Sequence, residues 1–355
     1  MIRTFLAIII FLFLLTSVKS SEFRLKEIYK GLDKPWSLSF INNDNIILTE
    51  KSGKLYSLNL KNKKIKEIKH NLSVKEHGQG GLLDVLYNDN QVYISYSENR
   101  GKSQTSTSVA KGKFNNSKIE FKNIFRAEPA INSGYHFGSR LVIKNNHLYI
   151  SVGERGKGMI AQDASKHPGS IIRINLDGSI PKDNPHFKTK KNWLPEIYQI
   201  GVRNPQGITL SPYDNKIYLT NHGAKGGDWF GAAAIGKNYG WKILGWGGTN
   251  YSGTKIGPKW KPGYTKPIKY WVPSIAVSAL LIYKGKEFEN WNGDALITSL
   301  KDKSLRKIKF KGNKFLNEEI IFQGDIGRIR DIKTQNKTGE IFLLNDNGSV
   351  WRLYK

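Results

Sequence analysis

The sequence contains no cysteine, so the protein has no disulfide bond, no thiolate nucleophile and no cysteine ligand for a metal. Acidic side chains are also scarce, because 29 Asp and Glu stand against 56 Lys and Arg, and the formal net charge is +27. Such an excess can serve nucleic-acid binding. The lysines are scattered, however, and the export signal described next disfavours that partner. The charge therefore indicates at most an attraction to anionic surfaces, and no nucleic acid is expected.

The chain begins with an apolar run that is too short to cross a membrane. Arg3 precedes the run Phe5–Leu15, and small and polar residues follow as far as Ser20. A positive start, an apolar stretch of this length and a small-residue end are typical of a secretory signal peptide, whereas a membrane span needs roughly 20 apolar residues. We expect residues 1–20 to be removed and the mature protein to be periplasmic or secreted, without a membrane span. We expect the mature protein to be a monomer or a homodimer.

Short strand-like runs recur along the rest of the chain, each followed by a polar turn and an alternating strand. Imperfect recurrence of such pairs, with almost no helical period, is typical of propeller blades. We predict an all-β, six-bladed β-propeller that forms a single domain over residues 21–355, with segment 22–30 pairing with the last blade. Two β-sandwiches are the alternative, but no Pro/Gly/Ser-rich linker divides the chain. The clearest runs are 45–50, 55–58, 147–152, 170–174, 216–220, 295–300, 304–308, 340–344 and 349–353.

His136 lies in a Gly-containing segment directly before a predicted strand. Imidazole is the side chain whose usual pKa lies nearest to neutrality, so it can accept a proton at working pH. A lone histidine is more often structural than catalytic, and both interpretations stay open on the segment alone.

Two arginine-containing segments suggest an anion site. Arg203 and Asn204 are followed by Pro205 and Gly207, which favours a rigid turn that holds their hydrogen-bond donors near a ligand. A buried arginine that caps the carbonyl groups of the turn would explain the segment equally well. Arg328 and Arg330 share one face of a strand by period-two alternation, and Asp331 points to the other face. Two neighbouring cations repel each other unless an anion lies near them, so the pair favours an anion-binding site. The alternative is that both arginines are solvated on an exposed strand face.

Metal-binding patterns are weak. No His-x-x-x-His pair and no His–carboxylate triplet at metal spacing occurs among the seven histidines, which disfavours a transition-metal hydrolase. The loop 221–228 offers carbonyl groups to a hard cation such as Ca²⁺, but it has too few carboxylates for an EF-hand. The Gly-rich segment 77–85 has no phosphate-loop lysine and predicts close backbone approach instead.

Taken in order, seven segments resemble the soluble quinoprotein family of aldose sugar dehydrogenases, the glucose/sorbosone dehydrogenase-like proteins. The resemblance runs from about Pro35 to the C-terminus and agrees with a six-bladed propeller. The segments are 35–38 (PWSL), 77–85 (HGQGGLLDV), 136–138 (HFG), 203–207 (RNPQG), 238–241 (NYGW), 300–303 (LKDK) and 328–331 (RIRD).

The resemblance implies pyrroloquinoline quinone (PQQ), a tricarboxylate o-quinone, as the cofactor. It implies that His136 takes the proton from the anomeric hydroxyl of an aldose and that Arg203 polarises the quinone oxygen. An aldonolactone would leave, and the electrons would pass to an external acceptor. The cofactor-binding residues implied by position are Gln79, Arg203, Asn204, Tyr251, Lys301, Arg328 and Arg330.

The same resemblance implies a Ca²⁺ held by the backbone carbonyls of Gly223 and Ala224. Many relatives have Glu and Pro where Asn221 and Ala224 stand here, which a backbone ligand tolerates. Trp229 replaces a Glu linked to a second, structural Ca²⁺, so that second site, which would also use Tyr239, is doubtful.

Two other functions compete with the dehydrogenase. A Ca²⁺-dependent lactone hydrolase requires more acidic and Asn ligands than the sequence brings together. A non-catalytic propeller that binds sugars or glycans is expected to lack His136 or Arg203, and both are present.

Overall fold

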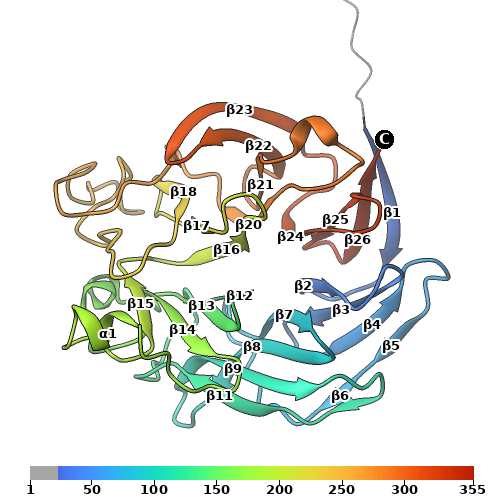
Figure 1. Cartoon of the computed structure of the whole chain (residues 1–355), viewed down its shortest axis with the longest axis horizontal. Coiled ribbons are helices and arrows are strands. Elements are labelled where there is room, and N and C mark those ends of the chain that lie inside the picture. Colours follow the sequence, from blue (N-terminus) through green and yellow to red (C-terminus); the bar gives the residue numbers. More distant parts are fainter. Residues whose placement is uncertain (1–22) are drawn as a thin grey trace, which may run out of the picture.

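The computed structural model describes residues 23–355, which fold almost entirely into β-strands. This range contains 26 strands, the α-helix α1 (Pro185–Lys188) and two 3-10 helices, Gly158–Gln162 and Glu289–Trp291. Six four-stranded antiparallel sheets surround a central axis (Figure 1), which confirms the predicted six-bladed β-propeller. Within the described residues no helix has the length and apolar character needed to cross a membrane. The predicted signal peptide, residues 1–20, lies outside the described residues.

Each blade contains four strands, and we number the blades in chain order. Blade 1 consists of β2 (Pro35–Phe40), β3 (Asn45–Glu50), β4 (Leu55–Asn59) and β5 (Ile65–Glu67). Blade 2 consists of β7 (Leu82–Asn88), β8 (Gln91–Asn99), β9 (Thr105–Lys113) and β11 (Lys122–Arg126). Blade 3 consists of β12 (Gly138–Lys144), β13 (His147–Val152), β14 (Ser170–Asn175) and β15 (Ile197–Ile200). Blade 4 consists of β16 (Pro205–Leu210), β17 (Ile217–Asn221), β18 (Asp228–Ala232) and β19 (Lys269–Trp271). Blade 5 consists of β20 (Val277–Ile282), β21 (Ala295–Ser299), β22 (Ser304–Lys311) and β23 (Lys314–Gln323). Blade 6 consists of β24 (Ile329–Thr334), β25 (Ile341–Asn345), β26 (Ser349–Tyr354) and β1 (Arg24–Lys30). A short parallel pair links β6 (Lys69–His70) to β10 (Lys118–Ile119).

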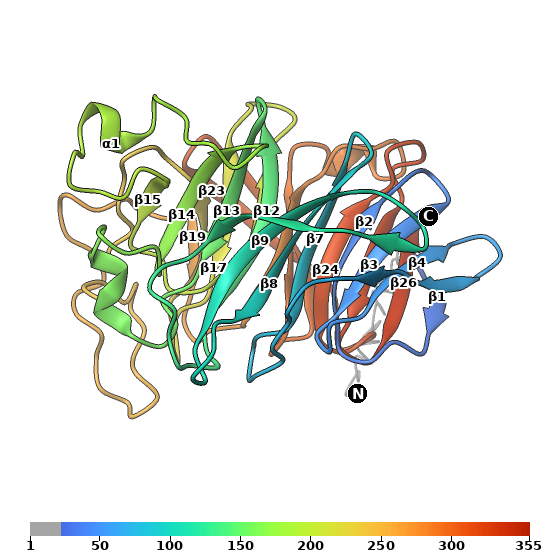
Figure 2. The same cartoon turned by 90° about the horizontal axis from the view of Figure 1, so that it is seen from below.

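The ring closes through strands from opposite ends of the described chain. β1 pairs antiparallel with β26 and completes blade 6, as predicted for segment 22–30. The two strands lie side by side in both views (Figures 1 and 2). Because β1 pairs with β26, the ring is closed between the first and last blades, and neither of these two terminal strands is left without a partner.

The hydrophobic core lies between neighbouring blades. Tyr93 and Val109 of blade 2, for example, pack in one cluster with Ile150, Ile172 and Ile174 of blade 3. Because side chains alternate between the two faces of a strand, each blade offers one apolar face to each neighbour. The first strand of every blade packs against the first strands of its neighbours and lines the axis.

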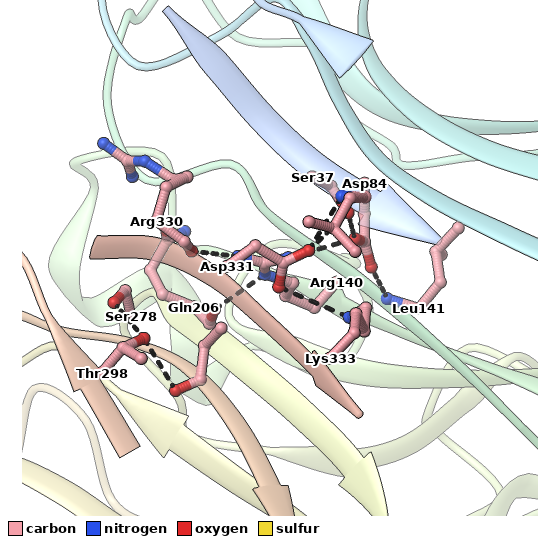
Figure 3. A network of polar contacts seen from close by, with 12 residues as sticks. Ser37, Asp84, Arg140, Leu141, Gln206, Ser278, Thr298, Arg330, Asp331 and Lys333 are labelled. Carbon is pink, nitrogen blue, oxygen red and sulfur yellow. Dashed lines mark hydrogen bonds and ion pairs between the residues drawn. The ribbon is translucent and has the colours of Figure 1, made fainter. Parts of the chain in front are cut away.

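A buried cluster of charged and polar side chains crosses this axis (Figure 3). Arg140 Nη1 lies 3.1 Å from Asp84 Oδ1 and 2.9 Å from Asp331 Oδ1. Ser37 Oγ lies 2.6 Å from Asp84 Oδ1 and 3.0 Å from Asp331 Oδ2, so its single O–H is shared between the two carboxylates. Burial alone raises the pKa of Asp331, but Arg140 and Lys333 outweigh it and hold that pKa below its usual range. The four residues Ser37, Asp84, Arg140 and Asp331 come from the inner strands of blades 1, 2, 3 and 6, so we call them the axial cluster.

Blades 4 and 5 join the axial cluster through backbone carbonyls and hydroxyl groups. Arg140 Nε donates to the carbonyl oxygen of Gln206 in blade 4, at 2.8 Å. In blade 5, Ser278 Oγ donates to the carbonyl oxygen of Ile329 at 2.6 Å, and its own carbonyl accepts from Thr220 Oγ1 at 2.7 Å. Hydrogen bonds along the axis therefore involve all six blades.

The axial cluster separates two cavities. The starts of the inner strands, including Ser139 and Arg330, line a cavity of about 320 Å³. Residues further along the same strands, including Val142 and Lys333, line a cavity of about 870 Å³. Since the cluster residues fall between these positions on each strand, the two cavities open at opposite ends of the axis.

Removal of the central cation is expected to destabilise the whole ring. Arg140→Met leaves two buried carboxylates without their partner, so we expect the free energy of unfolding to fall by about 3–5 kcal/mol. Denaturant unfolding monitored by tryptophan fluorescence measures this change. Lys61→Met is the control, because Lys61 forms an exposed ion pair with Asp44 and its loss costs about 0–1 kcal/mol. Similar losses for both variants would contradict a central role of Arg140.

Candidate functional site

The smaller cavity brings together residues that the sequence separates by more than 200 positions. Its lining includes four of the predicted cofactor-binding residues, namely Gln79, Asn204, Arg328 and Arg330. These residues precede or begin the inner strands of blades 2, 4 and 6, so the ring places them at one mouth of the axis.

His136 lies beside this cavity, on the loop that leads into β12. It is not itself a lining residue, but its neighbour Phe137 is, and only 9% of His136 is exposed. Its Nδ1 lies 2.5 Å from Glu154 Oε1, and its backbone N–H donates to Gln79 Oε1 at 2.8 Å. The sequence analysis missed Glu154, which follows β13 in a Gly-Glu-Arg-Gly turn 18 residues further on. The carboxylate fixes the ring through Nδ1 and leaves Nε2 as the atom that can exchange a proton.

The loop that carries His136 is held by a buried guanidinium. Arg155 lies over the ring of Phe137 at 3.7 Å and donates to the carbonyl oxygens of Tyr135 and Thr105, at 3.0 and 2.9 Å. The backbone carbonyl of His136 approaches Gly153 so closely that a Cβ there would lie 2.1 Å from the carbonyl oxygen. Glycine at 153 is therefore required by the close approach of the two chains.

The environment of His136 favours the neutral imidazole. Burial lowers the pKa of His136, the hydrogen bond to Glu154 raises it, and the charge of Arg203 lowers it again, so the pKa lies below its usual value. The ring is thus unprotonated at neutral pH and able to accept a proton. Burial raises the pKa of Glu154, but the hydrogen bond and charge of His136 together with the Gly158 N–H outweigh that effect and lower the pKa, so Glu154 is ionised. A carboxylate beside the ring stabilises the imidazolium that proton transfer creates.

Arg203 is also buried at this mouth. Its backbone N–H and that of Asn204 both donate to Asn221 Oδ1, at 3.0 and 2.9 Å, which fixes the turn before β16. Its guanidinium lies 5.3 Å from the centre of the Trp241 ring. Burial lowers the pKa of Arg203, while Tyr251 and Glu154 raise it, so Tyr251 also lies near this cation. Tyr251 is 75% exposed, on the long segment 233–268 beside β18 (Figure 1).

The cations of the site outnumber the carboxylates that neutralise them. Arg328 Nε and Arg330 Nε bind the two oxygens of Asp346, at 2.8 and 2.9 Å, so both predicted arginines do lie on one side of the strand. Lys301, in the turn after β21, does not line the cavity, although its neighbour Leu300 does, and it forms no ion pair with any described residue. Lys51, which the sequence analysis missed, lines the cavity and donates to the carbonyl of Gly78 at 2.7 Å.

Burial, and to a smaller extent the neighbouring positive charge, perturb the pKa of Lys51. Burial lowers its pKa, Glu76 raises it, and the nearby charge of Arg330 lowers it further, so the pKa lies below the usual value. An anionic ligand would relieve the repulsion among these cations. The site is therefore suited to a ligand that carries several negative charges.

The loop after β17 leaves two carbonyl groups available for a cation. The backbone N–H of Gly223 donates to Asp228 Oδ1 at 2.7 Å, and that of Ala224 to the carbonyl of Gly226 at 3.1 Å. No described residue donates a hydrogen bond to the carbonyl oxygen of Gly223 or of Ala224. Hard cations prefer such oxygens. Among residues 23–355, no group of three His, Asp or Glu side chains is placed to hold a metal.

The position of the doubtful second Ca²⁺ site contains an aromatic pair. The rings of Trp229 and Tyr239 stack at 4.1 Å with an interplanar angle of 17°, and both residues are buried. The Tyr239 hydroxyl donates to the carbonyl of Ala232 at 2.7 Å. Trp229 thus contributes packing, and no carboxylate occupies its position.

His222, directly before the Gly223–Ala224 carbonyls, is another lining residue that the sequence analysis missed. The residue as a whole is partly exposed, but its Nε2 is shielded and has no hydrogen-bond partner among the described residues. Its only sequence signal was its place in the loop 221–228.

A neutral imidazole paired with a carboxylate and surrounded by cations, at one mouth of a six-bladed ring, is the arrangement expected of a propeller enzyme that binds an anion. The chain belongs to the glucose/sorbosone dehydrogenase family, whose model matches residues 32–354. This match confirms the resemblance noted in the sequence and identifies a sugar dehydrogenase.

Individual relatives cover nearly the whole chain. Over 332 residues it is 35% identical to the aldose sugar dehydrogenase YliI of Escherichia coli, covering 90% of this chain and 88% of that protein. The apo-form structure of the soluble aldose sugar dehydrogenase from Escherichia coli matches with a TM-score of 0.88 at 34% identity, covering 94% and 99% of the two chains. The quinoprotein glucose dehydrogenase B of Acinetobacter calcoaceticus is 27% identical over 383 residues, covering 82% and 78%.

Glu154→Gln is expected to change the pH dependence of sugar oxidation. If His136 is the base, its protonation abolishes that action, so kcat/KM is expected to fall as the pH decreases through the His136 pKa. Because Glu154 raises that pKa, its replacement moves the acid limb to lower pH. The plateau also falls, by about 100-fold, since the imidazolium loses its stabilising carboxylate.

The pH profile of kcat/KM checks this expectation. Glu128→Gln is the control, because Glu128 is half exposed and pairs with Arg100 instead of a site residue. An acid limb that stays in place in Glu154→Gln would show that His136 is not the group that titrates.

Proposed function

We propose that this protein oxidises aldose sugars at the anomeric carbon to aldonolactones, with PQQ as the cofactor and an external electron acceptor. The buried His136–Glu154 pair beside an excess of cations carries the proposal. The quinoprotein relative and the aldose sugar dehydrogenase relative support the cofactor and the substrate class. Export to the periplasm or the medium, a single domain over 21–355 and a monomeric or homodimeric state belong to the same proposal.

The donor set of the site fits a tricarboxylate o-quinone. Arg328, Arg330 and Lys301 would bind its carboxylates as forked or point-charge donors. Gln79 Oε1 and Asn204 Oδ1 accept backbone N–H groups of the His136 loop, at 2.8 and 3.0 Å. Their NH₂ groups have no partner among the described residues and are left to donate to the cofactor. When bound, PQQ supplies the hydride acceptor of the reaction.

The residues of the chain supply the base and the charge. His136 Nε2 takes the proton of the anomeric hydroxyl, and Glu154 stabilises the imidazolium that forms. Arg203 holds a fixed positive charge at the mouth where negative charge develops during hydride transfer. Tyr251, near Arg203, would line the cofactor site. Both catalytic groups are buried, which strengthens their electrostatic effect.

The free carbonyl groups of Gly223 and Ala224 would hold a Ca²⁺ ion, which would bind the cofactor and polarise it. The bond from Gly223 N–H to Asp228 fixes the loop for this role.

The two competing functions find less support. A glycan-binding propeller has no use for a buried imidazole paired with a carboxylate. A Ca²⁺-dependent lactone hydrolase needs carboxylate ligands, and the described residues gather no such group.

Sugar oxidation should require both additions to the purified mature apoprotein. We expect dye reduction with aldoses only when PQQ and Ca²⁺ are present together, and we expect His136→Ala to lose turnover by at least about 100-fold while it still binds PQQ. Dye-linked assays with a panel of aldoses and absorbance titration of PQQ measure the two effects. Turnover without PQQ, or no PQQ binding at all, would contradict the proposed function.

The paired arginines should control cofactor affinity. Arg328→Ala combined with Arg330→Ala removes two charged hydrogen-bond donors, so we expect PQQ to bind at least about 100-fold more weakly. Arg352→Ala is the matched control, because Arg352 lies on β26 and pairs with Glu340 away from the cavity. Equal PQQ affinity in the double variant and the control would remove both arginines from the site.

A further inference from the structure

One shielded side-chain nitrogen of a residue that lines the smaller cavity has no hydrogen-bond partner among the described residues. His222 lines the same cavity as Gln79, Asn204 and Arg330, and its Nε2 is shielded from solvent without a hydrogen bond. Eight buried side-chain atoms among residues 23–355 lack a partner, and His222 Nε2 is the one whose residue lines this cavity. An unmade hydrogen bond at a buried polar atom is unfavourable, so such an atom at a binding cavity indicates a ligand group.

The backbone around His222 is fixed on both sides. Its N–H donates to the carbonyl of Asn204 at 3.1 Å, and its carbonyl accepts from Asn221 Nδ2 at 3.1 Å. The next residue, Gly223, is held by Asp228. The backbone of His222 is therefore fixed between Asn204, a predicted cofactor-binding residue, and the carbonyls of Gly223 and Ala224 that would hold the metal.

The electrostatics of the site favour a neutral donor at this place. Arg330 lines the same cavity as His222, and Arg203 directly precedes Asn204, whose carbonyl accepts the His222 N–H. Another cation here would add to the repulsion among these charges, whereas a neutral imidazole N–H offers a hydrogen bond without a charge. The carboxylates and quinone oxygens of the proposed cofactor are acceptors.

We propose that His222 is a further cofactor-binding residue, whose Nε2–H donates a hydrogen bond to an oxygen atom of bound PQQ. This assignment rests on the proposed function and adds to it a residue that the family motifs in the sequence did not indicate. It also explains why a nitrogen without a partner is kept at the cavity: the partner is supplied by the cofactor.

Two substitutions at His222 test the assignment by PQQ binding, without reliance on turnover. His222→Leu removes the donor and keeps an apolar volume, so we expect the dissociation constant of PQQ to rise by about 10- to 100-fold at saturating Ca²⁺. His222→Gln keeps an N–H near the Nε2 position and should stay within about 5-fold of the unaltered protein. His147→Leu is the matched control, because His147 lies on β13 and lines a different cavity.

Absorbance titration of each purified apoprotein with PQQ gives the dissociation constants, and thermal unfolding of the apoproteins checks that each variant folds. Equal PQQ affinity in His222→Leu and the unaltered protein would overturn the assignment alone. A Gln variant that binds as weakly as the Leu variant and needs more Ca²⁺ would overturn it in favour of a metal-ligand role. Failure of the unaltered protein to bind PQQ would overturn both the assignment and the proposed function.

Discussion

Arg140 and the two carboxylates of the axial cluster lie where the six inner strands meet, and the smaller cavity with the candidate site lies directly beyond them. Their charges are fully buried, so they are stable only as a paired group with all their hydrogen bonds made. The pairing therefore joins the inner strands of blades 1, 2, 3 and 6 at one level of the axis. The same strands carry site residues one or two positions before the cluster, as in Ser139 before Arg140 and Arg330 before Asp331. Arg140 even donates to the carbonyl of Arg330, at 2.7 Å.

The proposed active site balances two electrostatic demands. Binding a polyanion requires several cations close together, which destabilise one another while the ligand is absent. Asp346 offsets part of this repulsion by holding Arg328 and Arg330 on its two oxygens. The base requires the opposite condition, a site where the neutral imidazole is favoured before reaction. Burial and Arg203 meet that condition, and Glu154 limits their effect so that the ring can still accept a proton.

Much of the fold could be predicted from the sequence, because strand and turn patterns are local. The runs 45–50 and 147–152 became β3 and β13, and segment 22–30 paired with the last blade. The alternation that placed Arg328 and Arg330 on one face, opposite Asp331, is confirmed by their partners. The roles assigned to the site residues stay predictions.

The features that the sequence did not reveal depend on contacts between distant segments. Asp331 bonds to Ser37 across 294 positions, and no local pattern distinguishes it from a solvated aspartate. Glu154 sits in a turn whose chemistry is apparent only once Gly153 packs against the His136 loop. Lys51 is one lysine among many, and its place at the cavity comes from the ring.

The pairing of β1 with β26 has a consequence for how the protein is made. Blade 6 combines the first strand of the described chain with its last three, so the ring cannot close until β26 has been synthesised. Until then β1 has no partner, and five blades form an open arc whose edge strands can pair with other chains. A nascent chain of this kind stays sensitive to proteases and to aggregation until its last strand emerges, and then becomes resistant in one step.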